Sequence, residues 1–193
     1  MRWKYTLAWA YLVGVALGDG NLSNPNGRAI RLRVTCATRY PLMLKQIVAT
    51  IHILLPNNKI SFVRVPNKKN FLHISVYSNK LNELIPWRVN KGTKLQQRVR
   101  VPGWIKKDHE LSIECLRGLL QTDGSIYRDR GYMMVNFTNS SYPLALDVKR
   151  MMQGLGYRPT ITSTTQPSGN FKYTVRVARE TEKFVRHLKL YKA

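Results

Sequence analysis

Residues 12–20 read Leu12-Val-Gly-Val-Ala-Leu-Gly-Asp19-Gly20, and residues 116–124 read Leu116-Arg-Gly-Leu-Leu-Gln-Thr-Asp123-Gly124. Each segment is an apolar run with an internal glycine, closed by an aspartate and by a second glycine of the kind that often ends a helix. The two aspartates are 104 residues apart (123 minus 19). We interpret the segments as equivalent helices, one in each half of a duplicated protein.

The two aspartates stand out because acidic residues are scarce. The chain has 32 Lys plus Arg and 10 Asp plus Glu, for a net charge of +22. Within residues 1–90 the only carboxylates are Asp19 and Glu83. A polar residue that merely ends a helix is the simpler interpretation, but a scarce acid placed twice in the same motif favours a functional role.

The positive charge is spread along a chain that is 44% hydrophobic, so the basic surface belongs to a folded body. Such a protein is expected to bind a polyanion, with nucleic acid favoured over an anionic membrane because no long basic amphipathic helix is present. The apolar N-terminus resembles a signal peptide, but a similar segment recurs at 113–120, where no signal could act. We therefore expect an intracellular protein, in a prokaryotic cytoplasm or an organelle. Cys36 and Cys115 are isolated thiols, expected to serve packing.

The elements after each motif also repeat, which predicts an α+β fold. Arg31 and Arg33 alternate with apolar residues, as in a strand with one basic face. Tyr-Pro-Leu opens the next helix in both halves, at residues 40–42 and 142–144. Strands and helices are expected at 28–35, 40–55, 60–65, 71–77 and 79–85, and again at 132–138, 142–155, 158–164, 171–178 and 180–190.

We divide the chain into two repeats, at residues 1–87 and 109–193, joined by a basic linker at 88–108. The linker contains Pro102-Gly103, which is typical of an irregular segment. It either runs along the bound polyanion or is simply solvated.

Small residues form a stripe on the motif helices. Gly14 and Gly18 are four residues apart, as are Gly118 and Thr122, so each pair lies on one helix face and allows another backbone to approach. If the helices cross there, their C-terminal ends meet and bring the two aspartates together. Carboxylates at the negative ends of two helix dipoles need a positive partner. Lys or Arg could supply it, but clustered oxygen ligands suit a divalent cation such as Mg2+, which can activate water against a phosphodiester.

These paired motifs resemble those of the LAGLIDADG homing endonucleases, in the single-chain form that carries both copies. The resemblance covers essentially the whole chain. It implies a pseudo-twofold pair of αββαββα repeats, in which two antiparallel sheets form a saddle over DNA and the motif helices form the interface beneath it.

The resemblance also implies an activity. Family members are metal-dependent enzymes that cut both strands of a long, weakly palindromic DNA site and leave 3′ overhangs. Asp19 and Asp123 would then be catalytic and would bind the metal, assisted by the carbonyl groups of Gly18 and Thr122. Two or three Mg2+ ions are expected, with Mn2+ or Ca2+ able to substitute in binding. We expect a monomer that needs no protein partner and is encoded within an intron or is free-standing.

The resemblance assigns further roles on the sheets. The family places a basic residue near each catalytic centre on the last strand, a position that falls on Ser75 and Arg176, so Arg176 is the predicted catalytic cation of the second site only. Asn139 and Gln46 are weaker candidates for ordering water. The predicted DNA contacts are Arg28, Arg31, Arg33, Arg64, Lys68, Lys69, His73, Ser75, Arg128, Arg130, Asn136, Arg158, Thr160 and Thr162.

Other classes fit less well. The chain has no zinc-ligand spacing, no nucleophile elbow and no phosphate-cradling glycine loop. An intron maturase, or a DNA- or RNA-binding protein on the same scaffold, remains the alternative. Two retained aspartates favour the nuclease, because a protein that only binds has no need of them.

Overall fold

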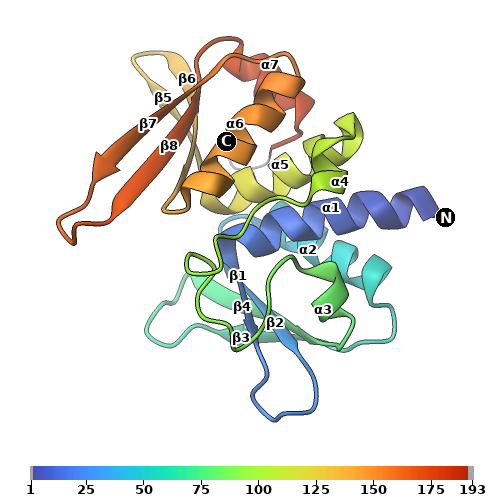
Figure 1. The fold of residues 1–193 in the computed structure, drawn as a ribbon. Helices are drawn as coiled ribbons and strands as arrows, with labels where there is room; N and C mark the ends of the chain where they lie inside the picture. Colours follow the sequence, from blue (N-terminus) through green and yellow to red (C-terminus); the bar gives the residue numbers. More distant parts are fainter. Residues whose placement is uncertain (1, 191–193) are drawn as a thin grey trace.

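Two lobes with the same order of elements meet at a pair of central helices in the computed structural model, which describes residues 2–190 (Figure 1). The N-terminal lobe comprises α1 (Arg2–Asp19), β1 (Gly20–Ser23), β2 (Arg31–Ala37), α2 (Pro41–Leu54), β3 (Ile60–Arg64), β4 (Phe71–Tyr77) and α3 (Leu81–Leu84). The C-terminal lobe comprises α5 (His109–Asp123), β5 (Gly124–Asp129), β6 (Tyr132–Asn139), α6 (Tyr142–Gly154), β7 (Pro159–Thr165), β8 (Phe171–Val177) and α7 (Thr181–His187). The predicted αββαββα pair is confirmed.

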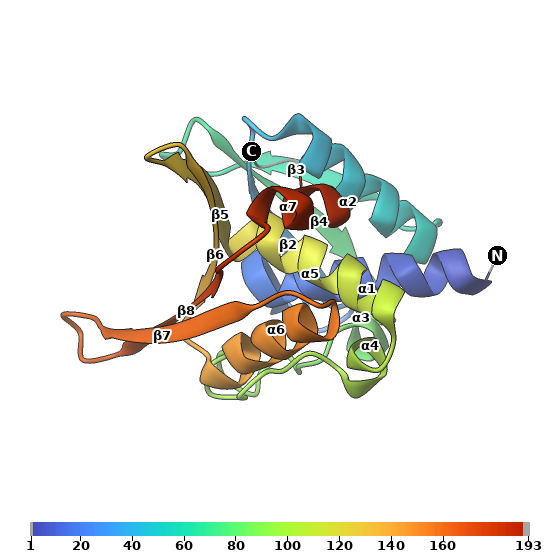
Figure 2. The ribbon, with the colours of Figure 1, turned by 90° about the horizontal axis from the view of Figure 1, so that it is seen from above.

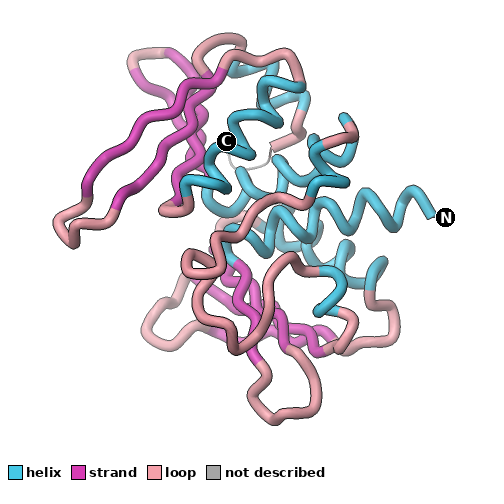
Figure 3. The backbone as a smooth tube through the Cα atoms, viewed as in Figure 1, coloured by secondary structure: helices cyan, strands magenta, loops and turns pink. Residues whose placement is uncertain are grey.

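Each lobe contains a four-stranded antiparallel sheet, in the order β1-β2-β4-β3 or β5-β6-β8-β7. The glycine after each aspartate pairs with a buried residue of the following strand, Gly20 with Val34 and Gly124 with Phe137. The two sheets therefore have the same register relative to their motifs. Helices cover one face of each sheet, and the β7-β8 hairpin projects away from them (Figures 2 and 3).

Helix α1 is apolar around almost its whole circumference, and the fold buries it. Between Ala8 and Leu17 every apolar residue except Trp9 is buried, because α1 packs against both α5 and α2. An all-round apolar helix is typical of this central position. No helix within residues 2–190 has both the length and the apolar character needed to span a membrane.

The segment between the lobes is more ordered than the sequence suggested. Val99 and Val101 are buried, and Pro102-Gly103, expected in an irregular linker, begins the short helix α4 (Gly103–Lys106). Pro102 is the N-cap of this helix, where its ring fixes φ at −54° and its missing N–H leaves no donor without a partner. The closing helix α3 is shorter than predicted, because Ile85 precedes a proline and adopts an extended backbone (φ −110°, ψ 133°).

A fully buried carboxylate fastens this segment to α6. Asp147 accepts a hydrogen bond from the backbone N–H of Val101 at 3.1 Å. Its Oδ1 atom also lies 2.7 Å from Arg100 Nη2 and 3.0 Å from Lys106 Nζ. A buried acid is tolerated only with such partners, so these contacts fix residues 100–106 against the C-terminal lobe.

We expect Asp147→Ala to lower the free energy of unfolding by about 2–4 kcal/mol, because a buried amide and two cations lose their acceptor. Urea unfolding measures the change. The control is Glu182→Ala, which removes an exposed ion pair with Arg128 (3.4 Å) and should cost about 0–1 kcal/mol. Equal losses in the two variants would contradict the role given to Asp147.

Candidate catalytic centre and nucleic-acid interface

The two motif helices touch through their glycines. A Cβ atom built on Gly14 would lie 2.2 Å from the carbonyl oxygen of Cys115, and one on Gly118 would lie 2.5 Å from that of Tyr11. A Cβ atom on Gly18 would lie 2.0 Å from Thr122 Oγ1. The structure thus brings together all four residues of the predicted small stripe, and the approaches at Gly14, Gly18 and Gly118 are ones that only glycine allows.

The crossing of α1 and α5 brings the C-terminal ends of the two helices, which carry Asp19 and Asp123, close together. The Cβ atom built on Gly18 would lie 3.4 Å from Asp123 Cγ, so the Asp123 carboxyl group lies beside the end of α1, the helix that Asp19 closes. The charges of both aspartates act on the same lysine, Lys94. Asp19 is exposed and Asp123 is half-buried. The following glycines are required for space rather than for an unusual φ, since a Cβ on Gly124 would lie 2.3 Å from the carbonyl oxygen of Leu120.

A lysine from the connecting segment sits at this point. Lys94 Nζ donates to the carbonyl oxygens of Leu17 at 2.7 Å and Ala16 at 3.2 Å, and also contacts that of Gly18. Burial lowers the pKa of Lys94, while the charges of Asp123 and Asp19 oppose this shift. The sequence offered no signal for this residue, because Lys94 is one of many cations in an aperiodic segment.

A cavity of about 470 Å³ opens beside Asp123. Its lining includes Gly18, Lys94, Asn139 and Lys172. Asn139 Nδ2 donates to Asp123 Oδ2 at 2.7 Å, so this amide orients the carboxylate. The other candidate, Gln46, lies on α2 and accepts a hydrogen bond from Gln121 at 3.2 Å.

The two halves differ at the position of Asn139. Counting two residues on from the partner of the motif glycine gives Cys36 in the first half and Asn139 in the second. Cys36 is buried, and its pKa is raised to about 12, first by burial and then by the charge of Asp19. The amide that orients Asp123 is therefore replaced by a neutral thiol near Asp19.

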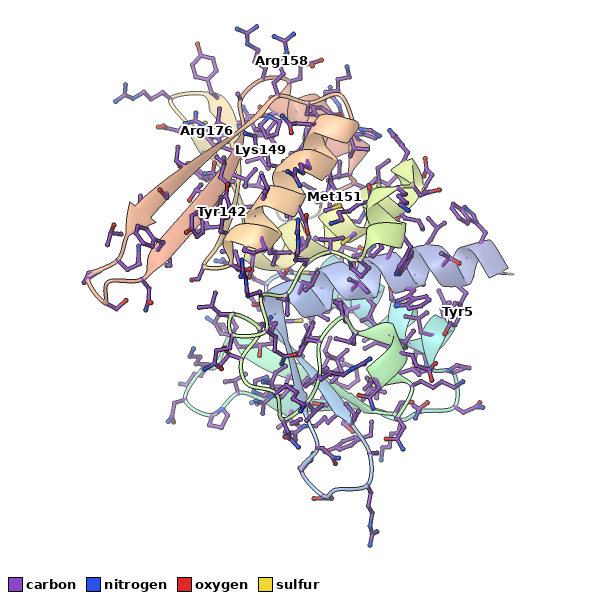
Figure 4. The ribbon with its side chains drawn as sticks, viewed as in Figure 1. Tyr5, Tyr142, Lys149, Met151, Arg158 and Arg176 are labelled. Carbon is purple, nitrogen blue, oxygen red and sulfur yellow. The ribbon has the colours of Figure 1, made fainter. Side chains whose placement is uncertain are left out.

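The structure corrects the role predicted for Arg176. Arg176 pairs with Asn136 as Ser75 pairs with Arg33, so the match of Ser75 to Arg176 agrees with the register. However, its guanidinium group points to Met134 Sδ at 3.3 Å, on the side away from Asn139, and Figure 4 shows it on the upper sheet near Arg158. Lys172 is instead the β8 cation that lines the Asp123 cavity.

The uncovered face of the N-terminal sheet is basic. Arg31 and Arg33 alternate with the core residues of β2, and each is partly exposed. His73, on the neighbouring strand, bonds Thr35 Oγ1 at 3.0 Å through Nδ1, and its pKa is lowered by burial and by the two arginines. Ser75 lies on this face but is only 7% exposed, so its predicted DNA contact is not available in the free protein.

Two predicted DNA contacts lie on the wrong face. Arg64 pairs with Leu72 and so shares the helix-covered face of Ile74. Arg128 follows Ile126 by two residues and pairs with Glu182 of α7. Because side chains alternate along a strand, neither arginine belongs to the uncovered face, and we correct both predictions.

The other predicted contacts fall on the uncovered faces or on loops. Asn136, Thr160 and Thr162 share the face of Arg176, and Asn136 Nδ2 donates to Tyr127 Oη at 3.3 Å. Arg28 precedes β2, Lys68 and Lys69 lie between β3 and β4, and Arg130 lies at the β5-β6 turn, with Arg158 just before β7. Both sheets thus present polar and cationic groups beside the crossing of α1 and α5.

The oxygen groups at this crossing suit a hard divalent cation. Two aspartates and the last carbonyl groups of the motif helices lie close together here, and within residues 2–190 no cluster of three or more His, Cys, Asp or Glu offers another site for a metal ion. Mg2+ is commonly held by one or two carboxylates and completed by substrate phosphates. The donor set therefore fits Mg2+ bound together with a phosphate-bearing substrate.

Comparison with known proteins agrees with this architecture. Residues 110–189 match the family model of the LAGLIDADG-like domain. The fold also matches I-DmoI in complex with DNA and Mn, at a TM-score of 0.69 and 22% identity, over 95% of this chain and 97% of that one. Residues 110–189 are a LAGLIDADG-like domain, and the chain as a whole has the two-lobed fold of I-DmoI. This confirms the family resemblance and the predicted fold class.

Two further structures match the same fold. A single-residue variant of I-DmoI, in complex with its target DNA in the presence of Mg, matches at a TM-score of 0.69 and 22% identity over 96% of this chain and 97% of that one. Full-length DUF199/WhiA from Thermatoga maritima matches at a TM-score of 0.61 and 14% identity, over 96% of this chain and 60% of that one. No curated protein sequence matches the chain. The fold alone therefore does not decide the activity.

Proposed function

We propose that this LAGLIDADG protein is a site-specific endonuclease that cuts both strands of a long, weakly palindromic DNA target with divalent metal and leaves 3′ overhangs. The observation that carries the proposal is the convergence of Asp19 and Asp123 at the glycine crossing of α1 and α5. In a chain with a net charge of +22, two scarce carboxylates lie at adjoining helix ends, where the negative ends of the helix dipoles favour a bound cation. The match to I-DmoI in complexes with DNA and Mn, Mg or Ca supports this proposal.

The chain's own residues have distinct parts in this proposal. Asp19 and Asp123, with the carbonyl groups of Gly18 and Thr122, would hold two or three Mg2+ ions. When bound, such ions lower the pKa of a water molecule and stabilise the charge on the phosphate and the leaving oxygen. Asn139 fixes the orientation of the Asp123 carboxylate, and Lys172 places a positive charge in the same cavity.

The sheets would bind the DNA. Arg31 and Arg33 lie on the uncovered face of the N-terminal sheet, and Arg176 lies on that of the C-terminal sheet. Arginine binds phosphate oxygens or reads guanine edges with two hydrogen bonds. A monomer suffices in this proposal, because the two lobes of one chain supply both halves of the DNA-binding surface.

A cleavage experiment tests the proposal. The protein is incubated with genomic DNA of its source, and with a plasmid carrying the rejoined sequences that flank its gene, with Mg2+ or with EDTA. Sequencing of new ends should reveal one recurring cut site with 3′ overhangs, only in Mg2+. Selective retention of duplexes without new ends would instead favour the binding protein or maturase, and an absence of both cuts and selective binding would also overturn the proposal.

A further inference from the structure

We infer that the ammonium group of Lys94 occupies the end of α1 in the metal-free protein and competes with a divalent cation for it, so that metal binding releases the linker from the proposed catalytic centre. The inference rests on the proposed function, because it concerns the metal site of that nuclease. It gives the segment between the lobes a part in the site.

The contacts of Lys94 are those of a cation at a helix end. Its Nζ atom lies within hydrogen-bonding distance of three successive carbonyl oxygens, from Ala16 to Gly18. Helix α1 has no basic residue in its own last turn. The C-terminal end of a helix is negative, so this ammonium group compensates the dipole of α1 as well as the nearby aspartates.

The neighbouring groups hold Lys94 in place. The ring of Trp87 lies 5.4 Å from Nζ, in the geometry of a cation–π contact. Gln97 Nε2 donates to the carbonyl oxygens of Arg88 at 2.9 Å and Gly92 at 3.0 Å, which closes the linker into a loop beneath Lys94. The charges of Asp19 and Asp123 act on the ammonium group, and the cation Lys172 lines the same cavity.

Lys94 and a metal ion would compete because both need the same carbonyl oxygen. The carbonyl group of Gly18 is both a contact of Lys94 and the predicted ligand of a metal ion. Lys94 also lines the cavity that holds Asp123. Two cations this close in a partly buried site repel each other strongly, so binding of a divalent ion there must displace the ammonium group.

Calorimetric titration with Mn2+, in the absence of DNA, tests the competition. Lys94→Met is expected to bind Mn2+ about tenfold more tightly than the wild type, the order of one charge interaction at a half-buried site. Lys94→Arg keeps the charge and should remain close to the wild type. The matched control is Lys91→Met, which removes an exposed charge from the same loop without touching α1. Unchanged or weaker binding by Lys94→Met overturns the inference.

Hydrogen exchange of the wild-type protein provides a test that needs no variant. Amides of residues 88–99 should exchange faster when Mn2+ is added, because the loop loses its anchor. Equal or slower exchange would contradict displacement of Lys94 by the metal ion.

The titration also distinguishes a failure of the proposed metal site from a failure of the proposed competition with Lys94. If a double variant carrying Asp19→Asn and Asp123→Asn gives the same heats as the wild type, the metal site of the proposed function is wrong. If the wild type binds Mn2+ at the aspartates but Lys94→Met binds it no better, only the competition is wrong.

Discussion

Asp19→Asn and Asp123→Asn are each expected to abolish double-strand cleavage while leaving DNA binding within a few-fold of the wild type. Asparagine keeps the shape of the side chain but removes the charge that would hold the metal ion. Loss of about 3 kcal/mol of metal stabilisation in the transition state corresponds to roughly a 10²-fold slower reaction. Conversion of supercoiled target plasmid to linear product, with binding measured by gel shift in Ca2+, checks both parts of this prediction.

The control for this charge removal is Asp129→Asn. Asp129 is an exposed acid at the end of β5, so the substitution changes the net charge equally but away from the helix crossing. It should cleave at the wild-type rate. Full linearisation of the plasmid by either motif variant would overturn the catalytic assignment, whereas loss of binding in both would show that the aspartates support the fold.

Substitution at Gly14 is expected to have the largest effect on stability. A Cβ atom there would meet only backbone: the carbonyl oxygen of Cys115 at 2.2 Å, its carbonyl carbon at 3.0 Å and the amide nitrogen of Leu119 at 3.1 Å. No flexible side chain can move aside, so the helices must separate. We expect Gly14→Ala to cost at least about 1–3 kcal/mol and Gly14→Val to cost more, as measured by urea unfolding.

The matched control for this substitution is Gly154→Ala. Gly154 ends α6, its built Cβ atom meets nothing within 4 Å, and its φ is not in the left-handed region. Because alanine restricts the unfolded chain, this variant should be as stable as the wild type or more stable by about 0.4–1 kcal/mol. A Gly14→Ala protein as stable as Gly154→Ala would mean that the helices do not pack through their glycines.

Much of the fold could be predicted from the sequence because its signals are local and repeated. The spacing of Gly14 and Gly18 defines a helix face, and the alternation around Arg31 and Arg33 defines a strand face. The copied Tyr-Pro-Leu start places α2 and α6. The predictions at Arg64 and Arg128 failed because one residue of strand register decides which face a side chain occupies, and register depends on the partner strand.

The sequence by itself determined that the protein is duplicated, that two small-residue faces allow its motif helices to cross, and that Asp19 and Asp123 end those helices. Only the tertiary structure decided which cations lie near the aspartates. They are Lys94 from the linker and Lys172 from β8 rather than Arg176. It also showed that Asn139 orients Asp123 where the first half has Cys36. The physical reason is that helix and strand periodicities are written within short segments, whereas the position of a long charged side chain depends on groups that folding brings from distant parts of the chain.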